Sequence, residues 1–271
     1  GNPGEQNYHY KIIGDNILIL DDLINEKIPE YHDLSCAKNP AIIIGESALK
    51  SKISKHVISS VKTLLKKINK LHGFNILHQH ASNVGSLLLG LQTKNLDNVY
   101  NSEFLYLVNA DELEINKKEN QFIVYQGSHG GENSSIADVI LPAASYSEKN
   151  GSFVNLEGRV QRSYKASYPP GTAKEDWEIF LNIAKSNKID IGFDSFEDLR
   201  KNMISEIAFL GKYDQIPKYN YDNLKVEDHE KKDFILEVNT IDYYKTNIIA
   251  RSSNTMNECK NVNFKNKKID A

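Results

Sequence analysis

The sequence predicts an α/β fold, a mostly parallel sheet with covering helices, followed by a C-terminal extended arm. Short runs of apolar and β-branched residues recur along the first half of the chain, each bounded by Gly, Asn or Pro. A helical pattern separates the first two runs. Strand, helix and strand in repetition are typical of a parallel sheet with right-handed crossovers.

Five runs are expected to be strands, and their near-continuous apolarity favours strands that are covered on both faces. They are AIII (41–44), NIL (75–77), FLYLV (104–108), FIVY (122–125) and DVIL (138–141). Between the first two, apolar residues spaced three or four apart from Ile53 to Leu71 predict an amphipathic helix, and Gly73 is placed to end it. A further apolar segment, Val84 to Leu91, separates the second and third strands.

The pattern changes after the fifth strand. The stretch EKNGSFVN predicts a β-hairpin that turns at Asn150-Gly151. A polar loop follows, and then a helix that opens at Glu175 and Asp176, with one apolar face. That face is expected to contain Trp177, Phe180, Leu181 and Ala184.

A second helix is expected to begin at Ser195, which opens an S-x-x-D start signal. The chain from Tyr213 onward has little apolar periodicity and is expected to lie as an arm on its own domain or on a partner. We therefore expect a lead-in segment over residues 1–40, an α/β domain over 41–186, and a helix and arm over 187–271.

Composition excludes several classes of function. The 271 residues carry a formal net charge of −3, so no overall field favours nucleic acid or an anionic membrane surface. The longest apolar runs are far shorter than the roughly 20 residues of a membrane-spanning helix. The two cysteines, Cys36 and Cys259, have no CxxC context, which argues against a zinc or iron–sulfur site and against a cysteine nucleophile.

Glycines at expected strand ends could form a phosphate-binding loop, because open α/β sheets bind ligands at that edge. Gly45 follows the first strand, and Gly127, Gly130 and Gly131 follow the fourth. Neither GxGxxG nor GxxxxGK[ST] is present, so glycines that make tight turns are the favoured interpretation.

Histidines near the same strand ends are candidates for metal binding or acid–base chemistry. His129 with Glu132 lies in a glycine-rich loop, and His78 with His80 follows the second strand. A loop spacing does not hold two side chains on one face as a helix would, and neither pair has a third ligand nearby. Ordinary hydrogen bonding in a loop or at a strand end is the favoured interpretation of both pairs.

The stretch EKNGSFVNLEGR could form a satisfied polar network, since an arginine fork can hold a carboxylate while asparagine bridges backbone groups. Its candidate members are Glu148, Asn155, Glu157 and Arg159. A general-acid role would need a pocket and a raised pKa, and neither can be seen in a sequence.

The run YQGSHGGENSSIADVILPAASYSEKNGSFVNLEGRVQ, residues 125–161, resembles the molybdopterin oxidoreductase superfamily. That superfamily has an ADV-[IV]-LP-A-A segment followed by E-K-x-G-[ST]-[FY]-x-N-x-E. Within it, the YQGSHG loop and the EGR triplet are most similar to the large iron–sulfur subunits of respiratory complex I. The segments HASNVGSLLLG (80–90), FLYLVNADE (104–112) and DYYKTNIIARSSNTMNEC (242–259) are also similar to those subunits.

The resemblance implies the C-terminal part of a molybdopterin-type domain, because the cysteine motifs that hold [2Fe–2S] and [4Fe–4S] clusters in that family do not occur here. No family catalytic, cofactor-binding or metal-binding residue transfers onto this chain. We expect no cofactor in it, and iron–sulfur clusters in a partner polypeptide that is the separate N-terminal half of a split subunit. The chain starts at Gly1, so we also expect that processing or truncation has removed a targeting segment.

The function that the resemblance implies is that of a non-catalytic structural subunit of mitochondrial NADH:ubiquinone oxidoreductase. Its partners would be the cluster-bearing half and other peripheral-arm subunits, on the matrix side of the inner membrane, with no nucleic acid and no membrane span of its own. Two alternatives remain open. One is a subunit that binds a pterin cofactor through QGSHGGE and the Asn155 region, and the other is a free-standing α/β binding protein.

Overall fold

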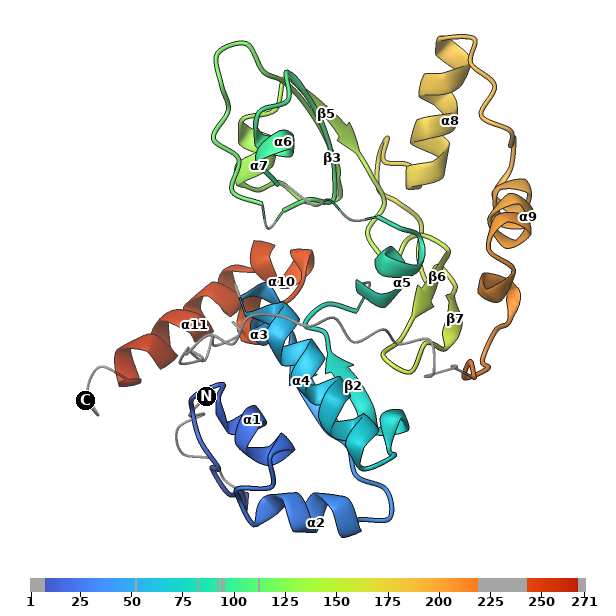
Figure 1. Ribbon diagram of the computed structural model, residues 1–271. Helices are drawn as coiled ribbons and strands as arrows, with labels where there is room; N and C mark the ends of the chain where they lie inside the picture. The colour runs from blue at the N-terminus through green and yellow to red at the C-terminus, as the bar shows by residue number, and fades with distance from the viewer. Residues whose placement is uncertain are drawn as a thin grey trace. The chain divides into compact units, whose positions relative to one another are not determined.

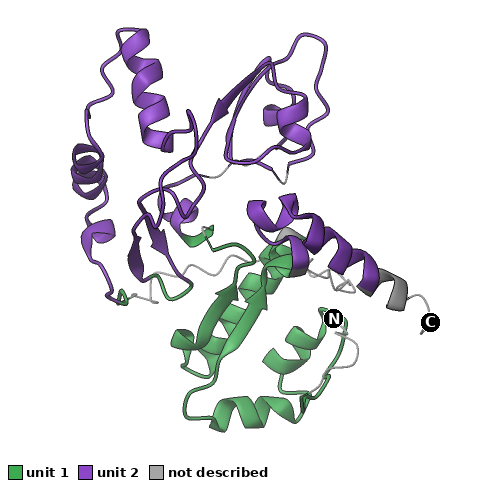
Figure 2. Cartoon of the chain, turned by 180° about the vertical axis from the view of Figure 1, so that it is seen from behind, with its two compact units in different colours: residues 1–84, 156–158, 216–240 green, residues 85–155, 159–215, 241–271 purple. Residues whose placement is uncertain are grey.

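The computed structural model describes most of the chain as two compact units (Figures 1 and 2). Unit 1 comprises residues 1–84, 156–158 and 216–240, and unit 2 comprises the rest. These units differ from the domain ranges 1–40, 41–186 and 187–271 that the sequence predicts. Those ranges stay a prediction. The structure describes residues 8–51, 53–81, 83–91, 93, 96–111, 113–218 and 243–267.

Unit 1 is built on two parallel strands and one long helix. β1 (Ile42–Gly45) pairs with β2 (Phe74–Leu77) in parallel, from Ile42 opposite Phe74 to Gly45 opposite Leu77. The connection between them contains α4 (Ser54–Lys67), which confirms the predicted strand–helix–strand unit. The shorter elements of this part of the chain are α1 (Ile19–Ile24), α2 (Glu30–Cys36), α3 (Glu46–Lys50) and the 3₁₀ turn η1 (Leu71–Gly73).

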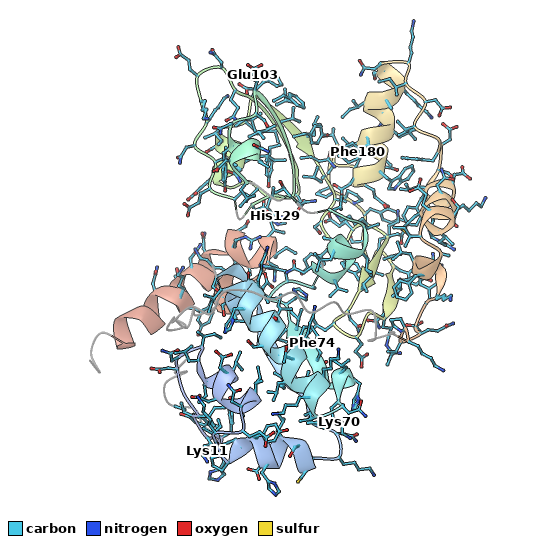
Figure 3. The ribbon with its side chains drawn as sticks, in the orientation of Figure 1. Lys11, Lys70, Phe74, Glu103, His129 and Phe180 are labelled. Atoms are coloured by element: carbon cyan, nitrogen blue, oxygen red, sulfur yellow. The ribbon has the colours of Figure 1, made fainter. Side chains whose placement is uncertain are left out.

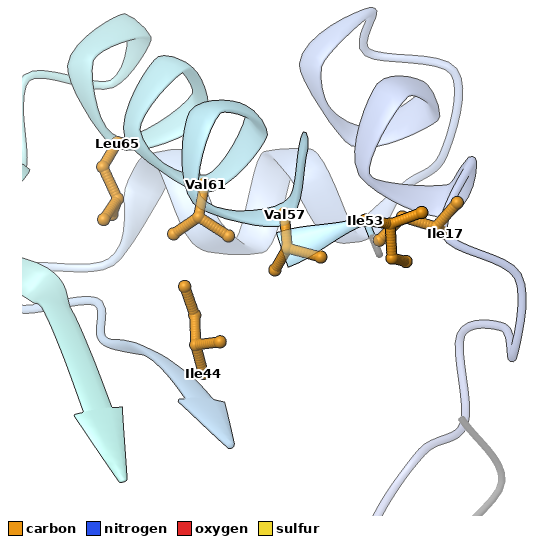
Figure 4. Packing of buried hydrophobic residues seen from close by; sticks show 6 residues of the cluster. All are labelled: Ile17, Ile44, Ile53, Val57, Val61 and Leu65. Carbon is orange, nitrogen blue, oxygen red and sulfur yellow. The ribbon is translucent and has the colours of Figure 1, made fainter. Parts of the chain in front are cut away.

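The core of unit 1 forms because α4 carries an apolar residue every three or four positions, and these line one face of the helix. Figure 4 shows this face packed against Ile44 of β1 and Ile17, which comes from the expected lead-in segment. Gly73 allows a close approach of backbones, since a Cβ there would lie 2.3 Å from the carbonyl oxygen of Pro40. The buried residues of the cluster are Ile17, Ile44, Ile53, Val57, Val61 and Leu65.

Unit 2 contains a three-stranded parallel sheet in the order β3-β4-β5. The strands are β3 (Phe104–Val108), β4 (Phe122–Gly127) and β5 (Val139–Pro142), so all five predicted strands exist and the parallel pairing is confirmed. They do not form one sheet among the described residues, because β1 and β2 pair only with each other. The helices near these strands in sequence are α5 (Asn83–Leu88), α6 (Leu96–Tyr100) and α7 (Glu132–Ser135).

Coverage of the three-stranded sheet is unequal on its two faces. One face buries Leu105, Leu107, Ile123 and Tyr125 beneath residues that include Val99, Ala110, Ile115, Ile136 and Ala137. On the other face, Phe104 and Phe122 stack at 6.2 Å between ring centroids and remain 57% and 47% exposed. This second face is covered only in part within the described residues, since Val124 and Gln126 are buried there and Phe180 stacks on Tyr106. The predicted coverage on both faces therefore fails only at the end that carries Phe104 and Phe122.

The predicted hairpin exists, but its predicted turn is wrong. β6 (Gly151–Val154) pairs antiparallel with β7 (Val160–Ser163), so the turn spans Asn155 to Arg159. The Asn155 side-chain oxygen accepts from the Arg159 N–H at 3.0 Å, and Gly158 adopts φ +77°, which glycine tolerates without strain. Asn150 instead precedes β6, where its side-chain oxygen accepts from the Lys165 N–H at 3.1 Å.

Both predicted helix starts after the hairpin are confirmed. α8 (Asp176–Ser186) begins after Glu175, and α9 (Phe196–Glu206) begins after Ser195, whose hydroxyl accepts from the Asp198 N–H at 3.2 Å. The buried residues of α8 are Ile179, Leu181 and Ala184. Phe180, expected on the buried face, is 39% exposed and stacks on Tyr106 of β3 at 5.5 Å.

The 3₁₀ turn η2 (Ala208–Gly211) precedes the expected arm. The arm is mainly irregular over residues 213–218 and mainly helical over residues 243–267. Its elements are η4 (Tyr243–Lys245), α10 (Ile248–Ser252) and α11 (Asn254–Lys267), whereas residues 219–242 of the arm lie outside the described residues. Local caps explain the helices, because the Asn247 side-chain oxygen accepts from the Ala250 N–H at 3.0 Å. In the described part of the chain, no helix combines the length and the apolar character that a membrane span requires.

Candidate functional site

The carboxyl ends of β3, β4 and β5 meet at one edge of the sheet, which is where open parallel sheets bind ligands. Figure 3 labels Glu103 and His129 at opposite ends of this sheet, with His129 at the carboxyl end. The loops at this edge are joined to each other, since the Ala143 N–H donates to the Gly127 carbonyl at 3.0 Å. This edge is therefore the place to test the sequence candidates.

Tyr125 occupies the centre of the edge. Its ring is buried in the sheet core, and its hydroxyl donates to the Asp111 carboxylate and lies 3.0 Å from the His129 carbonyl oxygen. Burial, and then the bond to Asp111, raises the pKa of the Tyr125 hydroxyl above its ordinary value, so the phenol stays protonated as a donor. No local sequence pattern marks Tyr125 and Asp111 as partners, because their contact depends on the path of the loop after β3.

Position 127 requires glycine because the Tyr125 side chain lies against it. A Cβ at position 127 would lie 2.5 Å from the Tyr125 hydroxyl oxygen, and the two next nearest atoms also belong to the tyrosine ring. The glycine therefore makes room for a side chain of the protein itself. This agrees with the interpretation of the glycine-rich loop as packing and turn geometry.

His129 and Glu132 are not brought together as a metal site. The His129 Nδ1 lies 2.9 Å from the Ser128 hydroxyl, and Glu132 begins the short helix α7. The described residues contain no group of three or more His, Cys, Asp or Glu side chains that could hold a metal ion. Hydrogen bonding within the loop accounts for this histidine.

The strand ends of unit 1 are held by Glu46, which sequence reasoning missed. Its Oε2 accepts from the Gln79 N–H at 2.6 Å and from the Asn83 side-chain amide at 3.0 Å, and it lies 3.6 Å from His78 Nδ1. Gly45 precedes it at the end of β1. His78 thus contributes to a strand-end hydrogen-bonded cluster, as the favoured interpretation predicts. The sequence feature that could have identified Glu46 is an acidic residue directly after the glycine that ends β1.

The expected network of Glu148, Asn155, Glu157 and Arg159 is divided by β6. Glu148 lies before this strand, where its carboxylate accepts from the Ser145 N–H at 3.0 Å. Asn155 and Arg159 join each other across the turn at the other end, and Glu157 belongs to that turn. Arg159 also donates to the Asp214 carbonyl at 2.9 Å. A four-residue strand spans roughly 13 Å, so the two groups do not form one network.

A buried polar chain runs instead from the sheet to α8. The Tyr106 hydroxyl donates to Gln126 Oε1 at 2.7 Å, and Gln126 Nε2 donates to Asp176 Oδ1 at 2.7 Å. Lys149 of the EKNG stretch forms an ion pair with the other oxygen of Asp176. Burial, and then the Asp176 charge, raises the pKa of Tyr106. Gln126 is fully buried and satisfied at both ends, which makes this chain a structural link between the sheet, α8 and the segment before β6.

A neighbouring buried carboxylate, Glu175, completes the start of α8. It is 6% exposed, lies 3.2 Å from the Lys165 ammonium, and accepts from the Trp177 indole N–H at 3.2 Å. Glu175 and Asp176 were both expected to open the helix. The structure adds their cationic partners, Lys165 for Glu175 and Lys149 for Asp176. The two cysteines take no part in these clusters, since Cys36 lies on α2 beside His32, Cys259 lies on α11, and both are exposed free thiols.

Comparison with known proteins identifies the family. Residues 1–186 match the family described as Molybdopterin oxidoreductase. The chain belongs to the molybdopterin oxidoreductase family. The resemblance of the Tyr125–Gln161 run to this family is thereby confirmed.

Individual relatives agree with this placement. The chain is 37% identical over 264 residues to an NADH-quinone oxidoreductase subunit of Rickettsia felis, covering 96% of this chain and 39% of that protein. It is 37% identical over 270 residues to the NADH-ubiquinone oxidoreductase 75 kDa subunit of Reclinomonas americana, covering 94% and 39%. The chain thus spans about two fifths of the length of these relatives.

Membership in this family implies a bound pterin dinucleotide, whose phosphates need N–H donors or cations at the strand ends. The residues at this edge do not fit a phosphate. The Asp111 carboxylate, with its side chain only 8% exposed, is an anion at the edge itself, and its nearby cation is Arg251 at 3.7 Å. The Gly131 N–H is already used, since it donates to the Ser134 hydroxyl at 2.8 Å.

Proposed function

We propose that this chain is a non-catalytic structural subunit of mitochondrial NADH:ubiquinone oxidoreductase, respiratory complex I, in the peripheral arm on the matrix side of the inner membrane. The names of its relatives, which are subunits of NADH-quinone oxidoreductase and of NADH-ubiquinone oxidoreductase, support the assignment to this complex. Electrons would pass through iron–sulfur clusters held outside this chain, which supplies no cofactor, metal or catalytic residue of its own.

The observation that carries the structural role is the presence of exposed apolar residues on one face of each parallel sheet. Parallel sheets are ordinarily covered on both faces. In unit 1, Ile43 and Leu77 are 63% and 53% exposed, and in unit 2 the stacked Phe104 and Phe122 are similarly open. Large apolar side chains exposed on a sheet face are typical of surfaces that contact another protein. Each unit thus presents a face that suits packing against another part of the assembly.

The strand ends support the absence of catalysis in the proposal. Acidic side chains, Glu46 in unit 1 and Asp111 in unit 2, hold the loops at both edges through hydrogen bonds within the protein. Side chains that are committed to the loops in this way are poorly placed to bind an anionic cofactor. In this proposal Gly127, His78 and His129 serve the packing and hydrogen bonding of the strand-end loops.

Incorporation into the complex tests the proposal. We expect the chain to co-migrate with complex I on a native gel of solubilised mitochondrial membranes. The double variant Phe104→Asp/Phe122→Asp should reduce incorporation strongly, because it places two charges on the apolar sheet face. Ile189→Asp, which changes an equally exposed apolar residue after α8, is the matched control and should incorporate normally. A chain that migrates alone as a monodisperse monomer would favour a free-standing binding protein instead.

The cluster-bearing partner is a second, separable part of the proposal. We expect it to be a separate polypeptide that co-purifies with this chain. Peptide mapping of the purified assembly tests this, since peptides of both parts in one polypeptide would contradict the split subunit.

A pterin-binding subunit of a molybdopterin-dependent oxidoreductase is the competing function, and family membership is the observation that favours it. Metal analysis and pterin fluorescence of the purified assembly separate the two. Stoichiometric molybdenum or tungsten with pterin would overturn the non-catalytic proposal, whereas their absence from an active assembly agrees with it.

A further inference from the structure

The described C-terminal segment, residues 243–267, has a local structure of its own. The Arg251 Nη1 donates to the Lys245 carbonyl at 3.3 Å, which joins α10 to η4. The Met256 N–H donates to the Ser253 hydroxyl at 3.4 Å, where α10 gives way to α11. With the Asn247 cap, these contacts let the segment keep its helices as a connected piece.

An ion pair connects this segment to the strand-end edge of the sheet. The Arg251 Nη2 lies 3.7 Å from Asp111 Oδ2, and the other oxygen of Asp111 accepts from Tyr125. Tyr125 is 2% exposed and belongs to the sheet core. Figure 3 shows α10 beside the end of the sheet that carries His129. A continuous path of charge and hydrogen bonds therefore runs from α10 into the core.

Apolar burial contributes little to holding the segment. None of its described side chains, from Tyr244 to Val262, is buried, and Val262 is 57% exposed. The Asp111 carboxylate, by contrast, is nearly buried. Removing the cation would leave that carboxylate inside the protein without its charge partner, which is costly. The polar contact thus has a large share in keeping the segment in place.

We propose that Arg251, Asp111 and Tyr125 form a latch that holds residues 243–267 against the carboxyl edge of the β3-β4-β5 sheet. Releasing the latch frees the segment while the sheet stays folded. The edge at which other α/β sheets take a ligand is closed here by the chain's own C-terminal segment. This latch does not depend on the assignment to complex I.

Hydrogen exchange of the full chain, read by mass spectrometry, tests the latch. In Arg251→Gln, we expect amides of residues 248–258 to exchange about 10-fold faster or more, because a charge-assisted contact to a nearly buried carboxylate is lost. Amides of β3 and β4 should keep their wild-type rates. Arg200→Gln is the matched control, since Arg200 on α9 pairs with a Glu197 side chain that is 61% exposed. It should leave exchange in the segment unchanged.

Two further variants keep the test decisive. Asp111→Asn should release the same amides, and the double variant should exchange little faster than either single variant, because both changes open one contact. Arg251→Lys, which keeps the charge, should restore part of the protection. Wild-type exchange in both single variants would overturn the latch. So would faster exchange that spreads equally through β3 and β4, since the segment would then open only with the sheet.

Discussion

Replacing Gly127 with alanine places a methyl group where the Tyr125 side chain already lies. The new Cβ would stand 2.5 Å from the tyrosine oxygen and 2.6 Å and 2.7 Å from two of its ring carbons, whereas ordinary contacts begin at 3.4 Å. The backbone at this position does not adopt a positive φ, so alanine is not strained by conformation. The ring itself must move, and it is 2% exposed among Leu105, Leu107 and Ile123.

Gly127→Ala lowers the stability of unit 2 in two ways. Overpacking a filled core costs about 1–3 kcal/mol. Displacing the ring also breaks the hydrogen bond to the charged Asp111, which contributes about 1.5–3 kcal/mol. The lower chain entropy of alanine in the unfolded state offsets about 0.4–1 kcal/mol. We therefore expect Gly127→Ala to reduce the free energy of unfolding of unit 2 by about 2–5 kcal/mol.

Urea unfolding of the full chain, followed by fluorescence of its single tryptophan, Trp177 on α8 of unit 2, measures this change. Gly131→Ala is the matched control in the same loop, because a Cβ there meets nothing within 4 Å and its φ of −169° is extended backbone. It should change stability by about 0.5 kcal/mol or less.

A double-variant cycle decides whether the tyrosine is the cause. In a Tyr125→Ala background the ring is absent, so the extra cost of Gly127→Ala should fall below about 1 kcal/mol. Equal effects of Gly127→Ala and Gly131→Ala, or an undiminished cost in that background, would refute the reasoning.

Three further predictions concern other parts of the fold. Burial raises the pKa of Tyr125, so its protonated phenol stabilises the fold fully below the unfolded pKa of about 10, and this stabilisation is lost as pH rises further. Between about pH 9 and about pH 11, the wild type should therefore lose more stability than Tyr125→Phe. Unfolding midpoints at each pH measure this, and parallel curves would contradict it. Leu65→Ala should cost unit 1 about 2–5 kcal/mol in thermal unfolding, since Leu65 is fully buried, and a loss below about 1 kcal/mol would count against the described core. Ser195→Ala should cost about 1 kcal/mol of local stability in α9. Ser195→Thr should cost much less, because threonine keeps the hydroxyl that bonds both the amide and the carboxylate of Asp198. Hydrogen exchange of the Asp198 amide measures both effects, and equal exchange in the two variants would exclude a capping role.

Local features of the fold could be predicted because each depends on residues close together in the chain. Apolar runs predicted the five strands, and the three-to-four spacing from Ile53 to Leu64 predicted the buried face of α4. The start of α9 followed from Ser195, since a cap bonds only three residues ahead. The hairpin was predicted as an element, but its turn was not. Asn150-Gly151 was the predicted turn, whereas the strands pair around Asn155 to Arg159.

The sequence by itself determined the family, through the motif over residues 125–161, and the strand–helix order that comes with it. Only the tertiary structure decided which side chains meet at the sheet edges. Asp111, Tyr125 and Arg251 are separated by up to 140 positions, and no local pattern marks them as partners. The exposed apolar parts of the sheet faces were likewise not predictable from the sequence, since an apolar strand has the same pattern whether its second face meets a helix of its own chain or the surface of a partner.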